Sequence, residues 1–199
     1  MGKAIIITGT PGTGKTSVAS VLAELLGVKH IDLSSYAIEK GFIIEYDAER
    51  HTYVIDEERL VKKIVKIIKN MPGYIIIDTH YPEIIPCELI EYVFVLRTHP
   101  RVLEERLRRK SWPDRKVKEN VMAEILSVVL SNIMNTCSNV RIYEIDTTNR
   151  DPVEVAKEIL GIIKGVKKPS SRVRIDWLSV LPQEEIAYYE NYGESVSNE

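Results

Sequence analysis

Short apolar runs that alternate with amphipathic segments dominate the pattern of the chain. Residues 4–7, 74–77, 92–96 and 140–145 are predicted strands, and residues 29–33 are a fifth candidate. The first three runs are almost continuously apolar, which is typical of parallel strands covered on both faces. The pattern therefore predicts an α/β three-layer fold, in which a parallel sheet lies between layers of helices.

The helices between these strands are marked by apolar residues at helical spacing and by capping residues. One helix is expected to begin after an Asp56 N-cap, and the longest amphipathic pattern predicts a single helix over residues 121–133. Asp151 precedes Pro152, and Glu154 follows at the spacing of a capping box. This combination predicts where the last helix of the core begins.

Two segments interrupt the alternation, and one follows it. Residues 42–55 form an insertion after the second strand, and residues 108–118 form a basic stretch between two helices. The composition changes near residue 165, so we expect a core domain over residues 1–165 and a polar C-terminal extension over residues 166–199. Within the extension, the large apolar ring of Trp177 is expected to pack on the core.

Composition and charge narrow the class of protein. The 199 residues include 27 Lys and Arg against 29 Asp and Glu, a net charge of -2, which argues against a globally basic nucleic-acid binder. No apolar run approaches the roughly 18 residues needed to cross a bilayer, and the first strand lies too close to Met1 for a signal peptide. Cys87 and Cys137 are too few and too far apart in sequence for a disulfide framework or a zinc site. These features predict a soluble cytoplasmic protein.

Residues 9–16, Gly-Thr-Pro-Gly-Thr-Gly-Lys-Thr, match the phosphate-loop pattern G-x-x-x-x-G-K-[ST] at every fixed position. In such a loop the backbone amides point at phosphates, and the following helix N-terminus adds a favourable potential. Lys15 would neutralise the β and γ oxygens of ATP, and the hydroxyl of Thr16 would ligate Mg²⁺. The alternative, a glycine-rich turn that binds nothing, is disfavoured by the complete motif between a strand and a helix.

Two further side chains are candidates for the same site. Asp78 ends the third predicted strand, where a Walker B acid would hold Mg²⁺ directly or through water. The alternative for Asp78 is a carboxylate that caps a turn. His80 would face the same side if the strand continued, and would orient a water molecule or contact a phosphate. A hydrogen-bonding role without catalysis stays open for this histidine.

Other nucleotide-binding classes fit less well. A small GTPase is disfavoured because no Asp is followed three places later by Gly, and residues 149–152, Asn-Arg-Asp-Pro, do not match N-K-x-D. The chain is short for an oligomeric AAA-type ATPase and lacks the L-S-G-G-Q signature of transporter ATPases. A kinase for a non-nucleotide substrate, such as shikimate or gluconate, fits the phosphate loop. The insertion and the basic stretch favour a nucleoside monophosphate kinase, because phosphoryl transfer between two nucleotides requires flaps that exclude water.

Several motifs together make the chain similar to the adenylate kinase isoenzyme 6 family, over about residues 3–163. They are the phosphate loop, Asp-Thr-His at 78–80, Phe-Val-Leu-Arg-Thr at 94–98, Glu-Arg-Leu at 105–107 and Glu-Asn-Val-Met-Ala-Glu-Ile at 119–125. The resemblance implies a P-loop NTPase fold of the nucleoside monophosphate kinase type, with a five-stranded parallel sheet. It places an NMP-binding region near residues 34–57 and a lid near residues 108–118.

The resemblance also implies an activity. It is the conversion of ATP and AMP to two ADP with broad specificity, together with slow ATP hydrolysis. The resemblance further implies a role in the late maturation of small-subunit ribosomal RNA. In that role the protein would act on pre-ribosomal particles and bind a small-subunit platform ribosomal protein. Arg150 falls in the family's adenine-contacting loop, and Asp78 with His80 in its Walker B motif. The residues expected to bind the triphosphate are Gly12, Thr13, Gly14, Lys15, Thr16 and Ser17.

The chain departs from the family pattern at two places. Lys110-Ser111-Trp112 stands where the family usually has Arg-Gly-Tyr at the lid entry, so we expect Lys110 or its neighbour Arg109 to contact ATP. Lysine keeps the charge of arginine but loses its planar stacking surface. The family's Asp-Leu-x-Arg reads Ser-Tyr-Ala-Ile at 35–38, which removes an arginine for the AMP phosphate. Arg50 or His51 in the insertion is a candidate replacement.

A second function stays open at this point. Residues 101–118 carry a local excess of five positive charges, which would suit RNA or an acidic protein tail as well as nucleotide phosphates. The alternative to a kinase is therefore an ATP-switched ribosome assembly factor in which kinase activity is vestigial.

Overall fold

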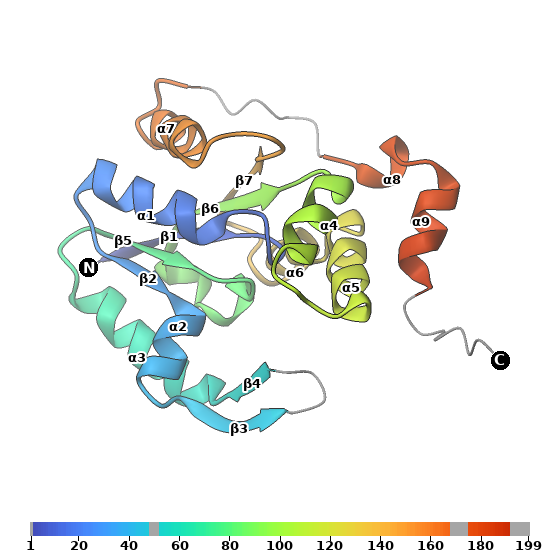
Figure 1. Ribbon diagram of the computed structural model, residues 1–199. Coiled ribbons are helices and arrows are strands. Elements are labelled where there is room, and N and C mark those ends of the chain that lie inside the picture. The colour runs from blue at the N-terminus through green and yellow to red at the C-terminus, as the bar shows by residue number, and fades with distance from the viewer. Residues whose placement is uncertain (1, 48–51, 168–174, 192–199) are drawn as a thin grey trace.

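The computed structural model, which describes residues 2–47, 52–167 and 175–191, has the predicted α/β architecture. A five-stranded sheet lies at its centre in the order β2-β5-β1-β6-β7, and every neighbouring pair is parallel (Figure 1). All five predicted strands are confirmed. They are β1 (Lys3–Thr8), β2 (His30–Asp32), β5 (Tyr74–Asp78), β6 (Ile90–Arg97) and β7 (Arg141–Asp146).

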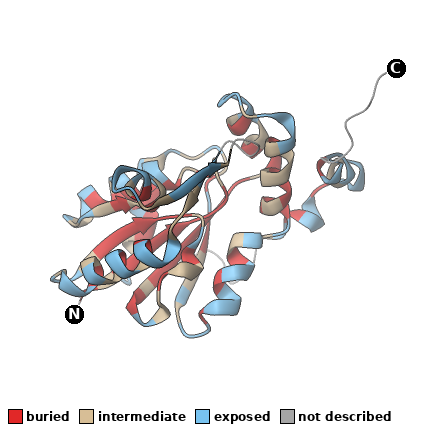
Figure 2. Ribbon diagram, turned by 90° about the horizontal axis from the view of Figure 1, so that it is seen from below, coloured by how far each residue is buried: buried red, intermediate tan, exposed pale blue. Residues whose placement is uncertain are grey.

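Helices cover both faces of this sheet, which explains why its strands are almost continuously apolar. Helices α1 (Lys15–Leu26) and α7 (Pro152–Ile163) pack on the face that carries Ile5 of β1. Helices α2 (Leu33–Glu39), α3 (Glu57–Asn70) and α6 (Val128–Thr136) pack on the opposite face, with Ile6. Successive strand residues therefore enter different cores. Figure 2 shows the buried strands between helices whose outer sides are exposed.

Two of the predicted helix starts are confirmed by their capping hydrogen bonds. The carboxylate of Asp56 accepts a hydrogen bond from the backbone N–H of Arg59 at 3.1 Å, before α3. That of Asp151 accepts one from the N–H of Val153 at 2.7 Å, before α7.

The prediction of one helix over residues 121–133 is wrong. The segment contains the end of α5 (Asp114–Ile125) and the beginning of α6, separated at Ser127, whose φ is +55°. A left-handed residue cannot continue a right-handed helix. The apolar pattern runs through the break because both helices are buried, but against different partners. Val121 joins a cluster with α4 (Pro100–Arg108), whereas Leu130 packs against the sheet.

The insertion after the second strand forms a hairpin that projects from the α2–α3 side of the molecule (Figure 1). Its strands are β3 (Ile43–Asp47) and β4 (Thr52–Ile55), which pair antiparallel. The exposed rings of Tyr46 and Tyr53 pack edge to face across the pair, with centroids 5.1 Å apart.

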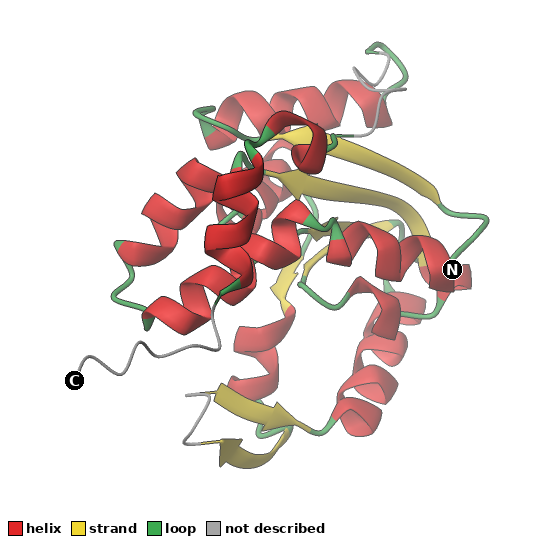
Figure 3. Cartoon of the chain, turned by 90° about the vertical axis from the view of Figure 1, so that its right-hand side faces the viewer, coloured by secondary structure: helices red, strands yellow, loops and turns green. Residues whose placement is uncertain are grey.

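The C-terminal part of the chain packs beside α4 and α5 (Figure 3). It contains α8 (Trp177–Val180) and α9 (Gln183–Glu190). Trp177, Leu181 and Tyr189 are buried there, which confirms the prediction that Trp177 packs on the core. Among the described residues, no helix has both the length and the apolar character needed to span a membrane.

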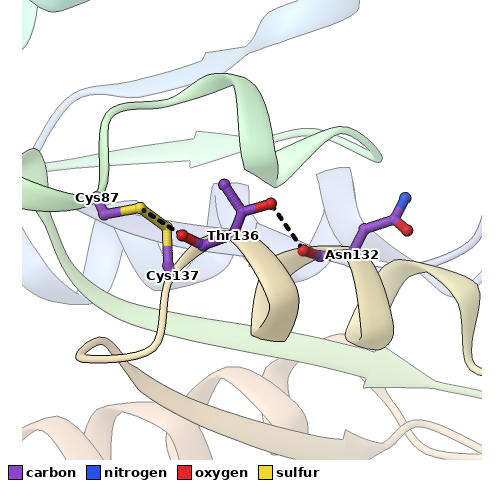
Figure 4. Close-up of a disulfide and its surroundings, with 4 residues drawn as sticks. All are labelled: Cys87, Asn132, Thr136 and Cys137. Atoms are coloured by element: carbon purple, nitrogen blue, oxygen red, sulfur yellow. Dashed lines mark hydrogen bonds between the residues drawn. A yellow bond between two sulfur atoms is a disulfide. The ribbon is translucent and has the colours of Figure 1, made fainter.

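The two cysteines, which were expected to be too few and too far apart for a disulfide framework or a zinc site, do form one disulfide. Cys87 and Cys137, 50 residues apart, form a disulfide with a Cα–Cα distance of 5.6 Å. Cys87 begins the 3₁₀ turn η2 (Cys87–Leu89), which follows another, η1 (Pro82–Ile84), and Cys137 lies at the end of α6 (Figure 4). Their separation along the chain does not prevent the bond, because η2 and the end of α6 lie on the same side of the sheet.

We predict that replacing both Cys87 and Cys137 by Ala lowers the free energy of unfolding by about 3 kcal/mol, because the bridge restricts the unfolded chain over a loop of 50 residues. Urea denaturation of the oxidised protein and of the double variant measures this difference. Reduction of the wild type should reproduce the loss. Two titratable thiols in denatured, unreduced protein would contradict the disulfide.

Candidate active site

The phosphate loop connects β1 to α1 and rests against β6. Gly9 has φ +142°, and a Cβ built on it would lie 2.4 Å from the carbonyl oxygen of Leu96. Gly14, at the N-cap of α1, has φ +94°. Both positions thus require glycine, for close approach and for backbone conformation. The loop therefore curls over the N-terminus of α1, as the motif predicts.

Lys15 is buried within this loop. Its Nζ donates a hydrogen bond to the carbonyl oxygen of Thr10 at 3.2 Å, and among the described residues it makes no ion pair with a carboxylate. Burial lowers the pKa of Lys15 to about 8, and the negative charge of Asp78 opposes this shift. A desolvated ammonium at a helix N-terminus is electrostatically suited to an anionic ligand.

Three side-chain oxygens gather next to Lys15. The hydroxyl of Thr16 lies 3.3 Å from Oδ1 of Asp78 and 3.5 Å from Oδ2 of Asp32. The two aspartates are adjacent because Asp32 in β2 pairs in register with Asp78 in β5. Hydroxyl and carboxylate oxygens are the donors that Mg²⁺ prefers, and one or two carboxylates suffice when phosphates supply further oxygens. Thr16 and Asp78 thus fit a magnesium ion bound with a nucleotide.

His30 is a member of the site that sequence reasoning missed. Its Nε2 lies 2.6 Å from Oδ2 of Asp78, which is buried. The contact orients the carboxylate so that its other oxygen faces Thr16. The position of His30 two residues before Asp32, in a strand next to β5, was the only signal for this contact.

His80 lies just beyond β5, which ends at Asp78, so the strand does not continue as the prediction for His80 assumed. Its ring packs against Tyr81, with centroids 4.7 Å apart. Burial and the positive charge of Lys15 lower the pKa of His80 to about 4. The imidazole is therefore neutral at pH 7 and able to accept a hydrogen bond from water.

A cavity of about 220 Å³ opens beside the loop. It brings together four residues predicted to bind ATP, namely Gly12, Thr13, Gly14 and Arg150. The other lining residues are Val18, Arg106, Thr147, Pro152 and Val155.

Arg150 is held at this cavity by two carboxylates. Its Nε donates to Glu154 at 2.9 Å and its Nη2 to Glu158 at 2.7 Å. Glu154 was predicted to close a capping box, but its carboxylate accepts from Arg150 instead. The guanidinium is thereby fixed between the cavity and α7.

Arg106, on α4, is the second arginine of the cavity; it belongs to the Glu-Arg-Leu motif at 105–107, which was assigned no binding role from the sequence. It donates to the carbonyl oxygens of Gly12 at 3.4 Å and Thr147 at 3.2 Å. Burial, with a smaller contribution from Arg109, lowers the pKa of Arg106. Its helical spacing from Arg109 was the available signal.

The basic stretch over residues 108–118 is only partly a connection between helices, because α4 ends at Arg108 and α5 already begins at Asp114. Arg109 is exposed and lies 3.8 Å from Glu105, while Nζ of Lys110 lies 5.8 Å from the ring centroid of Trp112. The charge of Lys110 contributes to the lowered pKa of Lys15, so the two ammonium groups share one electrostatic environment. Ser17 is exposed on α1. Arg50 and His51 lie outside the described residues.

Thr147, which follows β7, connects the phosphate loop to β6 through hydrogen bonds. Its hydroxyl lies 3.0 Å from the carbonyl oxygens of both Thr13 and Arg97, and 2.7 Å from Oγ1 of Thr98. All of these atoms are buried, so they depend on one another for hydrogen bonds.

The fold and this site define a P-loop protein with the architecture of small kinases. Similar solved structures include shikimate kinase from Acinetobacter baumannii, with TM-score 0.59, 20% identity and coverage of 83% of this chain and 94% of that one. Deoxyadenosine kinase from M. mycoides with bound dATP has TM-score 0.52 and 14% identity, over 81% of this chain and 99% of that one. At these identities the likeness establishes the fold. Residues 5–127 match the family described as AAA domain.

Sequence relatives identify the family more closely. A protein of Pyrococcus abyssi named "Putative adenylate kinase" is 40% identical over 178 residues, which are 88% of this chain and 92% of the relative. Its namesake in Sulfurisphaera tokodaii is 36% identical over 98% of this chain and 99% of the relative. The chain belongs to this archaeal family, and the family resemblance expected from the motifs is confirmed.

We predict that Thr147→Val lowers the free energy of unfolding by about 2 kcal/mol, since it leaves buried partners without a hydrogen bond while keeping the shape of the side chain. Urea denaturation measures the change. Thr136→Ala, which removes an exposed hydroxyl bonded to the carbonyl of Asn132, is the matched control and should change stability by less than about 0.5 kcal/mol. Equal effects of the two substitutions would contradict the role of Thr147.

Proposed function

We propose that this protein is a broad-specificity nucleoside monophosphate kinase that transfers the γ-phosphoryl group of ATP to AMP and yields two ADP. The observation that carries the proposal is the buried Lys15, which makes no ion pair with a carboxylate among the described residues and lies beside the oxygens of Thr16 and Asp78. This arrangement suits a polyphosphate bound with a cation. The name shared by the archaeal relatives supports the same activity.

The reaction needs positioning and charge neutralisation rather than a general base, because the attacking phosphate oxygen of AMP is already anionic at pH 7. Lys15 neutralises the β and γ oxygens of ATP, and the loop amides of Gly12, Thr13 and Gly14 donate hydrogen bonds to them. Thr16 and Asp78 would hold Mg²⁺, which would supply additional charge stabilisation when bound. Arg106 and Arg150 border the adjoining cavity, where we place the nucleoside of ATP.

We assign the binding of the acceptor and the exclusion of water to two further regions of the chain. The NMP-binding region over residues 34–57 includes the hairpin of β3 and β4, and the lid over residues 108–118 carries Arg109 and Lys110. Closure of both would remove water from the phosphates and strengthen each charge interaction there. Residues 166–199 are the C-terminal extension of a core over residues 1–165.

ATP hydrolysis is the second reaction that we propose for the same site. Water is a weaker nucleophile than a phosphate oxygen, so it has to be oriented. We assign this role to the imidazole of His80, which is neutral because burial and the charge of Lys15 lower its pKa. The motifs shared with the isoenzyme 6 family support a cytoplasmic role in small-subunit ribosomal RNA maturation, through a platform ribosomal protein.

A coupled assay of ATP consumption with and without AMP, CMP or dAMP tests the proposal. A kinase should show strong stimulation by a nucleoside monophosphate, with accumulation of ADP. ATP consumption that no nucleoside monophosphate stimulates, with one phosphate released for each ATP consumed, would contradict the kinase and favour the ATP-switched assembly factor.

We predict that Lys15→Ala abolishes both phosphoryl transfer and hydrolysis, because it removes the charge opposite the transferred group. Steady-state rates of ADP and phosphate formation measure the loss. Lys69→Ala, which removes an exposed lysine at the end of α3, is the control and should keep wild-type rates. Unchanged turnover in Lys15→Ala would refute the assignment of the site.

We predict that His80→Ala impairs ATP hydrolysis more than AMP phosphorylation, because only hydrolysis requires an oriented water molecule. The two rates, measured on one preparation, should differ in their loss by about tenfold or more. An equal loss in both assays would mean that the imidazole has a structural role alone.

A further inference from the structure

Glu124, on α5, is a buried carboxylate that the proposed reaction does not use. It is 2% exposed, and its two oxygens accept hydrogen bonds from separate parts of the chain. Oε2 accepts from the hydroxyl of Thr10 at 2.7 Å. Oε1 accepts from Nε of Arg97 at 2.7 Å, from the backbone N–H of Thr98 at 3.1 Å and from Nε1 of Trp177 at 3.2 Å. One side chain therefore joins the phosphate loop, a sheet strand and the C-terminal extension.

Thr10 connects this carboxylate to the loop lysine. Its side chain bonds Glu124, while its carbonyl oxygen accepts from Nζ of Lys15 at 3.2 Å and from the hydroxyl of Thr13 at 2.9 Å. The orientation of the Thr10 backbone thus determines where the ammonium of Lys15 is held. A change in the position of Glu124 would therefore alter the position of the Lys15 ammonium, with Thr10 as the one residue between them.

The other end of the connection is anchored by the extension itself. The indole of Trp177 is buried and packs edge-on against His99, with centroids 5.3 Å apart. Farther along, Glu185 of α9 accepts three hydrogen bonds from Arg101 of α4, the shortest at 2.6 Å. The extension is therefore bound to the α4–α5 pair at more than one place, which gives the indole N–H a fixed direction.

We propose that Trp177 and Glu124 are positioning residues for ATP binding, through a continuous connection from Trp177 to Glu124, Thr10 and Lys15. The C-terminal extension thus helps to position the phosphate loop, although Trp177 lies more than 150 residues after the loop in sequence. Loss of the indole N–H removes one of the four hydrogen bonds that hold the Glu124 carboxylate, so the carboxylate and, through it, the Thr10 backbone that holds Lys15 are positioned less precisely. The inference rests on the proposed binding of ATP at this loop.

The test compares ATP affinity in two variants that each remove a single polar group. Trp177→Phe removes the N–H and keeps an aromatic ring, and Thr10→Val removes the hydroxyl and keeps the branched shape. Each should raise the Kd of ATP with Mg²⁺ about fivefold, the effect of one hydrogen bond. Because both act through Glu124, the double variant should weaken binding by less than the product of the single effects.

Glu185→Gln provides the matched control, because it weakens the attachment of the same extension to α4 without touching Glu124. It should leave the Kd of ATP at the wild-type value. The KM for AMP should stay unchanged in Trp177→Phe while the KM for ATP rises, a split that general loosening of the fold would not produce.

Separate results identify which statement fails. If wild-type protein binds ATP and Trp177→Phe binds it equally well, or if Glu185→Gln weakens binding as much, the positioning role is wrong. Should Trp177→Phe not fold, an unchanged Kd in Thr10→Val overturns the role in the same way. If folded wild-type protein binds no ATP at all, the proposed function fails first and the inference falls with it.

Discussion

The burial of the Lys15 ammonium is the constraint on which the rest of the site depends. Removing a lysine from water lowers its pKa, here to about 8, and disfavours its charged form unless an anion compensates. Among the described residues no carboxylate contacts Nζ, and Asp78 and Asp32 act on it only through their charge. Their carboxylate oxygens instead lie within hydrogen-bonding distance of the Thr16 hydroxyl. The site therefore keeps an attractive potential for anions at the N-terminus of α1.

A buried ammonium at a fixed position requires a rigid phosphate loop, and side chains from several elements hold this loop in place. Arg106 of α4 binds the carbonyl of Gly12, Thr147 after β7 lies against Thr13, and Glu124 of α5 binds Thr10. Each of these partners is more than 90 residues away in sequence. The phosphate loop is thus held in place by the packed part of the molecule. The hairpin of β3 and β4, to which we have proposed that the acceptor binds, instead exposes large apolar residues such as Ile44.

Sequence patterns predicted the parts of this structure that depend on local interactions. Strand identity follows from apolar runs, the starts of α3 and α7 follow from capping aspartates, and the phosphate loop follows from glycines at fixed spacing. The break at Ser127 was missed because the apolar pattern is the same on both sides of it. A hydrophobic period reports burial, and it does not report which partner covers each half.

The remaining contacts depend on three-dimensional packing that a single sequence does not specify. The pairing of His30 with Asp78 requires that β2 and β5 be neighbours in register. The bond between Trp177 and Glu124 requires the extension to return to α5, and the bridge between Cys87 and Cys137 requires η2 to lie beside the end of α6. Residue type alone identified none of these pairs, because each side chain is also common in a purely structural role.

Calorimetric titration of ATP with Mg²⁺ into folded protein tests the central claim most directly. The account predicts saturable binding of one ATP per chain, with an affinity that falls steeply when Lys15 loses its charge. Absence of heat and of any other binding signal, in protein whose cooperative thermal unfolding shows that it is folded, would contradict it.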